Sequence, residues 1–428
     1  MLRVFKTLFL CLFLLPTFLV AENKEKTLLE TFNDEIPGDF SLSLQSLFMG
    51  REDGGQSTKN HDQHAGTTAF TLGYISDTYE GFSLGAQYVY SWQHYSGGSY
   101  GGRYDSAYVL HNNDFEVLNE LYLKYDLNHL GLEKSYIKVG RQVLDLNFVR
   151  AYNIRQKDQA FEAAVLHIGD IDNWQITLGH LEKFSSWSSR DILERGNLVS
   201  DFNEIETVEN VPYATKGFQF AEITYTGIKG AKISVYDYYG NDLYNTFGLN
   251  LDYTLIDGDW DTIFKGRYIN QNDVGKYAKY RSEINSQAFQ LGLQFKKGNF
   301  SIEPGIFIVT GSGTDNGIKS PFQPNLIIEE PLWETDLGFL GGSETAYLET
   351  SYSIGKHSFY GLLMYTDFTE NKDSGTSGDV SEANLIYGYD VTDNFYFKVK
   401  LAYANYDFKE GFGNQWVMDY RFFIGYRF

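Results

Sequence analysis

The last fourteen residues alternate between two kinds of side chain, and this period of two constrains the fold more than any other feature. From Gln415 to Phe428, one set of alternate positions is entirely apolar or aromatic, and the intervening set is largely polar or small. The first set is Trp416, Met418, Tyr420, Phe422, Ile424, Tyr426 and Phe428, and the second is Gln415, Val417, Asp419, Arg421, Phe423, Gly425 and Arg427. Because strand side chains point alternately to opposite faces, the segment predicts a strand with one apolar and one largely polar face.

The same alternation recurs along most of the chain. In residues 395–403, Phe397 and Leu401 oppose Lys398 and Lys400. In residues 117–125, Val117 and Leu121 are expected to share one face, opposite Glu120 and Lys124. We count about 18 such strands, a number typical of large transmembrane barrels. Their predicted starts are Asp39, Thr67, Gly81, Phe115, Ser135, Gln159, Trp174, Lys216, Ala231, Leu243, Trp260, Ser286, Asn299, Ser343, Ser358, Ser381, Phe395 and Gln415.

Composition favours a membrane barrel over a soluble β-sandwich. Aromatic residues make up 17% of the chain, yet the mean hydropathy is −0.33. Such a balance is expected when only alternate residues face lipid and aromatic rings mark both ends of each strand. Residues 39–428 therefore predict an all-β, transmembrane, antiparallel up-and-down barrel, with long outer loops and short periplasmic turns.

The N-terminus has the layout of a secretory signal. Arg3 and Lys6 precede an almost wholly apolar run from Leu8 to Val20, and Ala21 offers a small residue for cleavage. The run is shorter than the roughly 20 residues of a membrane-spanning helix, so we expect a signal peptide at 1–21 and a short periplasmic segment at 22–38. Cys11 is the only cysteine, so the mature chain should contain no disulfide.

Connections between the predicted strands alternate in length. We expect short turns at 76–80, 169–173, 227–230, 257–259, 297–299 and 392–394, and long loops at 51–66, 92–114, 143–158, 185–215, 271–285, 311–342 and 369–380. Two places fit less well. The connection at Asn241 is short for an outer loop. Pro304 lies inside a predicted strand of a closed barrel, where it implies a bulge or a misplaced boundary.

No catalytic or metal-binding motif stands out. The sequence has no G-x-S-x-G nucleophile elbow and no H-E-x-x-H zinc motif. His61 and His64 are close together in a predicted loop, where solvated side chains are a simpler interpretation than a metal pair. We therefore expect no cofactor, no metal and no enzyme activity, although a barrel lipase or protease could have catalytic residues far apart in sequence.

Inward-facing charges carry the functional information. Lys265 and Arg267 share the face opposite Trp260, Phe264 and Tyr268, so both should face the lumen. Charged side chains that line a pore select ions, although pairing within the wall is the simpler role for any one of them. Further inward candidates are Lys138, Lys398, Lys400 and Arg421, and the loop at 143–158 adds Arg150, Arg155 and Lys157 with Asp145 and Asp158.

The stretch from Tyr136 to Phe184 resembles the OprD-like family of outer-membrane porins, including its relatives in epsilon-class bacteria. The resemblance rests on Gly140-Arg141-Gln142, Arg155, Phe161-Glu162-Ala163, Asp172-Asn173-Trp174 and Leu178-Gly179-His180, together with Gly38-Asp39-Phe40 and the terminal Phe428. It implies an 18-stranded barrel whose third and seventh outer loops form a constriction, with a ladder of basic residues that guides carboxylate-bearing solutes.

Carried onto this chain, the resemblance puts Arg141, Arg150, Arg155 and Lys157 at or near the constriction, and makes residues 311–342 the seventh loop. One departure concerns the residues after Arg155. Family members often have a proline there, and this chain has Gln156-Lys157-Asp158. The constriction is therefore expected to differ in detail.

The net charge of −21 comes largely from predicted outer loops. The acidic clusters are Asp191, Glu194, Asp201, Glu204, Glu206 and Glu209 in one loop, and Glu329, Glu330, Glu334 and Asp336 in another. They would attract cations at the mouth, bridge divalent ions to lipopolysaccharide, or simply keep the loops solvated. Nucleic acid is not expected as a partner, because the chain has no basic patch to neutralise phosphates.

These features predict an outer-membrane diffusion channel for small polar solutes and ions, as a monomer or a homotrimer. The alternatives are a barrel enzyme and an adhesin, but a barrel of about 18 strands leaves an open lumen. Outer-membrane lipid and lipopolysaccharide are expected around the barrel. The alternating end with Tyr426 and Phe428 resembles the signal read by the barrel assembly machinery.

Overall fold

The computed structural model describes residues 36–55, 61–98, 114–151, 153–185, 200–201, 217–280, 284–311, 317–319, 338–368, 377–409 and 414–428. The expected signal peptide at 1–21 and most of the segment at 22–38 lie outside these residues. So do nearly all the acidic residues of the two outer loops.

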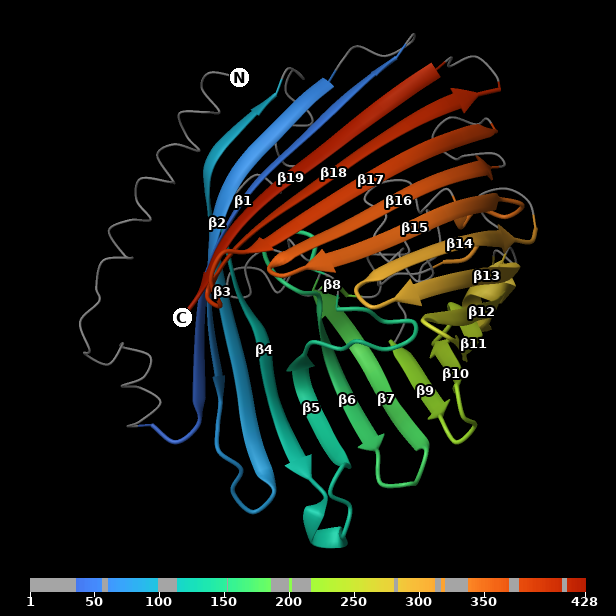
Figure 1. Cartoon of the computed structure of the whole chain (residues 1–428). Coiled ribbons are helices and arrows are strands. Elements are labelled where there is room, and N and C mark those ends of the chain that lie inside the picture. The colour runs from blue at the N-terminus through green and yellow to red at the C-terminus, as the bar shows by residue number, and fades with distance from the viewer. Residues whose placement is uncertain are drawn as a thin grey trace.

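The described residues form one antiparallel sheet that closes on itself (Figure 1). Each long strand pairs with its neighbours in chain order, and β1 completes the ring by pairing with β19, for example through Ser43 and Arg427. The strands are β1 (Asp39–Gly55), β2 (His61–Ile75), β3 (Phe82–Gly98), β4 (Phe115–Asp126), β5 (Tyr136–Gln142), β6 (Ala160–Ile168), β7 (Trp174–Ser185), β8 (Ser200–Asp201), β9 (Phe218–Tyr225), β10 (Ala231–Gly240), β11 (Tyr244–Asp257), β12 (Trp260–Asp273), β13 (Asn285–Lys297), β14 (Phe300–Val309), β15 (Glu344–Ile354), β16 (His357–Phe368), β17 (Gly378–Asp390), β18 (Phe395–Phe408) and β19 (Asn414–Arg427).

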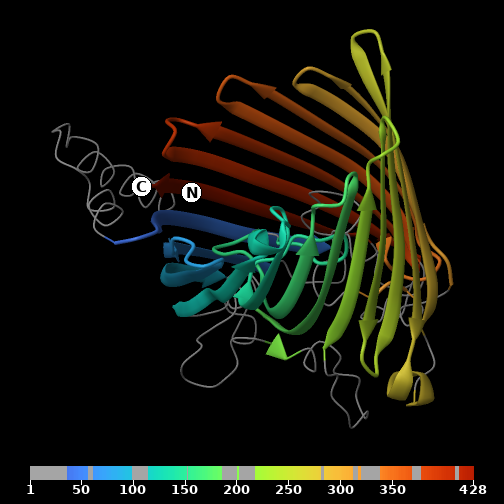
Figure 2. The ribbon, with the colours of Figure 1, turned by 90° about the horizontal axis from the view of Figure 1, so that it is seen from below.

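Eighteen of these strands make the barrel wall. The exception is β8, a two-residue segment that pairs only with Lys183 and Phe184 at the end of β7, while β7 pairs directly with β9 lower down. In Figure 2 the colours follow one another round the wall until red β19 lies beside blue β1. The predicted fold class and strand number are confirmed.

The alternation in the sequence corresponds to the two faces of this wall. On β19, Met418 is 37% exposed on the outer surface, whereas Val417 and Asp419, on the inner face, are buried. Large exposed apolar residues recur at alternate positions on most other strands, as expected for a lipid-facing surface.

Most predicted strand starts agree with the structure within one or two residues. The largest difference is at β2, which begins at His61, so most of the predicted loop at 51–66 is strand, and His64 pairs with Gly50 within the ladder. The lipid-facing alternation marks only the apolar part of each strand. Backbone pairing continues beyond it among polar residues, which the pattern cannot detect.

A bulge in β4 reverses which side chains point to the lumen and which point outwards. Gln87 pairs with Glu120, but its neighbour Tyr88 pairs with Leu118, so Asn119 is an extra residue. Leu121 is consequently 46% exposed on the outer face, while Val117 is buried on the inner face. The prediction that these two residues share a face was wrong, because one inserted residue reverses the alternation.

Pro304 interrupts one ladder without a bulge. The pairs Gly292–Gly305 and Phe295–Ile302 keep the same register on either side of a two-residue gap in the β13–β14 ladder. Pairing of β14 with β15 continues through Pro304. The missing N–H of proline is thus tolerated as a local gap towards β13, and the expected bulge is absent.

Connections at one end of the barrel are short, and those at the other end include most of the long ones, as predicted. The short connection at Asn241 exists, since β10 ends at Gly240 and β11 begins at Tyr244. Two small helices, η1 (Asn128–Leu130) and α5 (Gly275–Tyr280), lie in connections. Among the described residues, no helix is long and apolar enough to span a membrane.

Candidate functional site

The connection between β5 and β6 folds into the lumen. We call residues 143–159 the inward loop, with a near half (143–151) and a far half (153–159). In the near half, Phe148 is fully buried. Its ring lies 5.3 Å from that of Tyr238 and 6.4 Å from that of Tyr236, both on β10. The near half is thus packed into an aromatic cluster on the inner wall, together with Leu144 and Val149.

A buried carboxylate also holds the near half. Glu222 on β9 accepts hydrogen bonds from the backbone N–H and the side-chain amide of Asn147, each at 2.8 Å, and from the hydroxyl of Tyr238 at 2.6 Å. Asn250 on β11 donates to the Asn147 side-chain oxygen at 2.8 Å. Hydrogen bonds to a charged acceptor are stronger than neutral ones, so this contact fixes the loop on the β9–β11 side of the lumen.

The far half reaches the opposite wall, where the barrel closes. Gln45 on β1 donates to the carbonyl oxygen of Arg155 at 2.9 Å and to the side-chain oxygen of Gln156 at 3.1 Å. Gln156 donates to Thr67 on β2, and Arg421 on β19 donates to the carbonyl oxygen of Ile154 at 3.3 Å. The inward loop therefore crosses the lumen from one wall to the other.

Lys157 anchors the return of the loop to β6. Its amine is buried and donates to the hydroxyl of Ser185 at 3.0 Å and to the carbonyl oxygen of Asp158 at 3.3 Å. Burial lowers the pKa of this amine to about 7, against the opposing effect of the Asp158 carboxylate. Burial likewise raises the pKa of Asp158. Lys157 does not line either of the cavities described below.

A cavity of about 520 Å³ lies on the near side of the inward loop. Its lining carries charges of both signs in almost equal number. The basic residues are Lys138, Arg150, Lys232, Lys265 and Arg267, and the acidic residues are Asp145, Glu222, Glu303 and Glu349. We call it the larger cavity.

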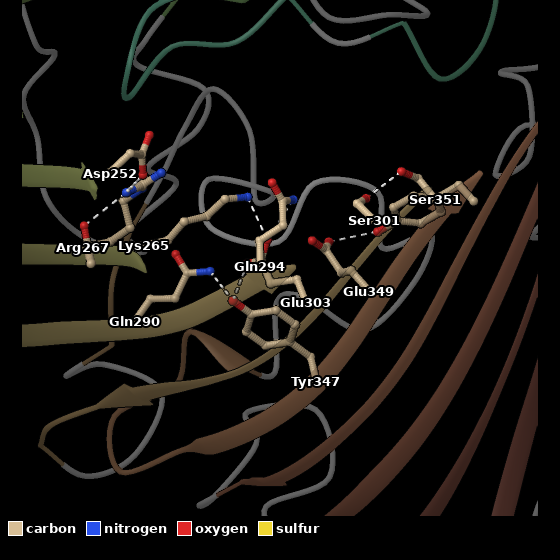
Figure 3. Close-up of polar contacts among 12 residues, drawn as sticks. Asp252, Lys265, Arg267, Gln290, Gln294, Ser301, Glu303, Tyr347, Glu349 and Ser351 are labelled. Atoms are coloured by element: carbon tan, nitrogen blue, oxygen red, sulfur yellow. Dashed lines mark hydrogen bonds and ion pairs between the residues drawn. The ribbon is translucent and has the colours of Figure 1, made fainter. Parts of the chain in front are cut away.

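Much of the charge in the larger cavity is paired within the wall (Figure 3). Lys265 lies 2.6 Å from Glu303, and Arg267 lies 2.6 Å from Asp252 on the neighbouring strand. Tyr347 joins this network, since it accepts from Gln290 at 2.6 Å and donates to Glu303 at 3.1 Å. Paired charges hold the wall rigid and leave little net field for one sign of solute.

A second cavity, of about 370 Å³, lies on the far side of the inward loop, and we call it the smaller cavity. It shares no lining residue with the larger cavity. Asn153 of the loop faces it, opposite inner-wall residues of β1 and β16–β19. Its charged lining residues are Lys398, Lys400, Arg427 and Asp390. Lys398 and Arg427 are exposed, whereas Lys400 is buried.

The sequence-predicted site residues separate into four groups. Four of them line the larger cavity together: Asp145, Arg150, Lys265 and Arg267. Three hold the structure round the inward loop: Lys157, Arg155 through its carbonyl oxygen, and Arg421, which pairs with Asp419 at 2.8 Å. At the chain end, the Tyr426 and Phe428 rings lie 4.7 Å apart, and Phe428 bonds to Leu42 of β1.

Arg141 forms the fourth group, because it faces away from the lumen. It has the parity of Ile137 and Val139, which are 40% and 50% exposed on the outer surface, while Gln142 lines the larger cavity. Its guanidinium lies 2.5 Å from Glu162 on β6. The expectation that Arg141 lies at a constriction is therefore wrong in geometry. The pairing with Glu162 reduces the cost of a basic side chain on the outer face.

Only part of the loop at 311–342 is described, and that part packs inside the wall. Lys319 and inward-facing Gln271 exchange two hydrogen bonds, at 2.7 and 2.8 Å. Ile318 and Phe339 are buried against Phe307 of β14. Residues 320–337 lie outside the described chain, so their predicted role at a constriction stays a prediction.

Sequence reasoning missed several residues that shape the site. Lys232 could have been found, because it shares the parity of Ser234 and opposes Ile233 and Val235. Glu222 and Asn147 could not, because their contact joins a strand to a loop 75 residues away.

Comparison with known proteins agrees with this architecture. A family model described as outer membrane porin, OprD family, matches residues 38–323, which is more than half of the chain. The chain belongs to the OprD family of outer-membrane porins. It is therefore an outer-membrane protein, and the family to which it belongs consists of channels. No curated protein matches it.

Solved structures of OprD-type porins share the fold at low sequence identity. The chain is similar to Acinetobacter baumannii OccAB4, with a TM-score of 0.73, 17% identity, and coverage of 92% of this chain and 99% of that one. It is also similar to Pseudomonas aeruginosa OpdK with vanillate, with a TM-score of 0.71 and 15% identity, covering 91% and 98%. Pseudomonas aeruginosa OccK2 (OpdF) in complex with glucuronate gives 0.70 and 15%, with the same coverage. The relationship to epsilon-class members stays a prediction.

Proposed function

We propose that this OprD-family porin passes small organic anions, and that the smaller cavity is their route past the inward loop. The observation that carries the proposal is the charge of that cavity, whose lining has three basic side chains and one acidic one. In the larger cavity, basic and acidic residues nearly balance and several are paired with each other. Two of these basic side chains, Lys398 and Arg427, are exposed, and accessible cations attract carboxylates and repel cations.

The relatives support the same class of solute. Vanillate and glucuronate, which accompany two of the similar structures, are both carboxylates. We infer a transport role without catalysis, in which the protein supplies a polar passage and an electrostatic preference. The basic residues of the larger cavity, Arg150, Lys265 and Arg267, would contribute to the potential of the lumen.

Single-channel recording in a planar bilayer tests the proposal. The refolded mature protein is measured in a salt gradient, and vanillate or glucuronate is then added on one side. We expect stable conductance, a reversal potential of anion-selective sign, and a concentration-dependent current change with either carboxylate. A folded barrel that conducts with cation selectivity and ignores both solutes would contradict the proposed anion route.

Removing the two exposed cations of the smaller cavity should reduce anion selectivity. A unit charge on the wall changes the energy of a monovalent ion about 6 Å away in water by about 0.7 kcal/mol. This energy corresponds to a roughly threefold change in the local concentration of that ion. Lys398→Gln with Arg427→Gln is therefore expected to lower the anion-to-cation permeability ratio by about threefold or more. Lys232→Gln, which removes one cation from the larger cavity, is the matched control and should shift the ratio less.

A further inference from the structure

The two halves of the inward loop are held in different ways. The near half is buried in the aromatic cluster, where Phe148 has no exposed surface. The contacts of the far half with the opposite wall are hydrogen bonds from Gln45, Gln156 and Arg421. A neutral hydrogen bond adds only about 1 kcal/mol net and one from the charged Arg421 about 1.5–3 kcal/mol, whereas a buried aromatic side chain adds about 3–5 kcal/mol. The far half is thus the more weakly held part of the loop, and Gln45 makes two of its contacts.

Gln45 is the residue at which these contacts meet. Its amide nitrogen donates to Arg155 and Gln156, and its amide oxygen accepts from the Tyr396 hydroxyl at 2.7 Å. The carbonyl oxygen of Arg155 requires a donor, so the orientation of the Gln45 amide is determined by its partners. Gln45 also lines the smaller cavity.

Tyr396 reaches Gln45 across an intervening strand. Tyr396 lies on β18 and Gln45 on β1, and Gly425 of β19 is paired with both. A side chain at position 425 would overlap the Tyr396 ring, so glycine is needed for this close approach. The hydroxyl thereby holds the Gln45 amide in place from the cavity side.

We propose that Gln45 is a positioning residue that holds the far half of the inward loop beside the smaller cavity and so sets the width of the anion route. This inference rests on the proposed function of that cavity. Loss of the Gln45 donors frees the carbonyl oxygen of Arg155 and lets Asn153 move away from Lys398 and its neighbours. The smaller cavity then widens towards the larger one.

Gln45→Leu tests the proposal, because leucine keeps nearly the same bulk and removes all three hydrogen bonds. We expect a unitary conductance about twofold higher, with more open-channel noise and weaker anion selectivity, since a wider pore screens its wall charges. Ser301→Ala removes a polar group of the inner wall that bonds to Ser351 and lines neither cavity, and should leave the conductance unchanged. Tyr396→Phe releases the Gln45 amide indirectly and should give a smaller change in the same direction.

A second readout follows the loop itself. Cys11 of the predicted signal peptide is the only cysteine, so Asn153→Cys places a single thiol in the mature chain. In the Gln45→Leu background we expect the thiol at position 153 to react about tenfold faster with a charged thiol reagent. A tenfold larger population of the released loop corresponds to about 1.4 kcal/mol.

The two readouts separate this inference from the proposed function. If the unaltered protein is anion-selective but Gln45→Leu changes neither conductance nor thiol reactivity, Gln45 does not position the loop. If the unaltered protein is not anion-selective but thiol reactivity rises in Gln45→Leu, the anion route is wrong and the positioning role stands.

Discussion

Replacing Phe148 with alanine is expected to detach the near half of the inward loop from the wall and to cost about 3–5 kcal/mol of stability, as for other buried aromatic side chains. The ring is fully buried between the loop and the β10 tyrosines. Gly248 lies directly beneath the Tyr236 ring, where any larger residue would overlap it. Loss of the Phe148 ring therefore removes the loop side of a cluster that is already packed closely against the wall on its other side.

Two measurements check this prediction. Urea unfolding of the refolded barrel, followed by its heat-modifiable migration, should show a lower midpoint, and single-channel recording should show higher and noisier conductance. Phe264→Ala is the matched control, because it also removes a phenyl ring, but from the lipid-facing surface, where that ring is 47% exposed. Equal losses of stability in the two variants, with unchanged conductance, would show that the loop does not depend on Phe148.

The barrel wall could be predicted closely from the sequence because lipid imposes its own pattern on every strand. Most outward positions are apolar, so the starts of strands such as β4, β7 and β18 can be located from alternation alone. The inner face has no such requirement. Its charges are matched to partners on nearby strands of the wall, such as Glu303 on β14 for Lys265 on β12, and those partners are distant in sequence.

The errors have two physical sources. A bulge such as that at Asn119 shifts the alternation by one residue and leaves no mark in composition. Arg141 was misplaced for a different reason, since its position came from a family motif, whereas its parity with Ile137 and Val139 places it on the outer face. Where a strand has no bulge, its alternation is thus the safer guide to whether a side chain points to the lumen or to the outer surface.

The path of the inward loop could not be predicted, because no local pattern specifies it. Its charged residues suggested that 143–158 lies near the solute path, and Asp145 and Arg150 do line a lumen cavity. Its attachment depends on Gln45, which is 110 residues from Arg155, and on Glu222, which is 75 residues from Asn147. Contacts of this range follow from barrel closure, which brings β1 and β9 to opposite sides of the same loop.

Lys157 is expected to make the stability of the barrel depend on pH. The unfolded chain holds this amine at its ordinary pKa of 10.5, and burial lowers the folded value to about 7. Below pH 7 both states are protonated and the full cost of the buried charge is present. Between these two values the unfolded state binds more protons, so stability rises with pH. From about pH 6.5 to 9.5 we expect a gain of roughly 3 kcal/mol as an upper limit.

Lys157→Met isolates this contribution, because methionine keeps the length of the side chain without its charge. The groups that influence the amine are Asp158 and Arg141, and both remain in the variant. We expect Lys157→Met to be more stable than the unaltered protein at about pH 6.5 and to lose this advantage near pH 9.5, where only the bond to Ser185 is missing. Urea unfolding at a series of pH values measures both slopes. Parallel slopes in the two proteins would mean that the amine stays charged in the folded barrel, with water or Asp158 compensating its burial.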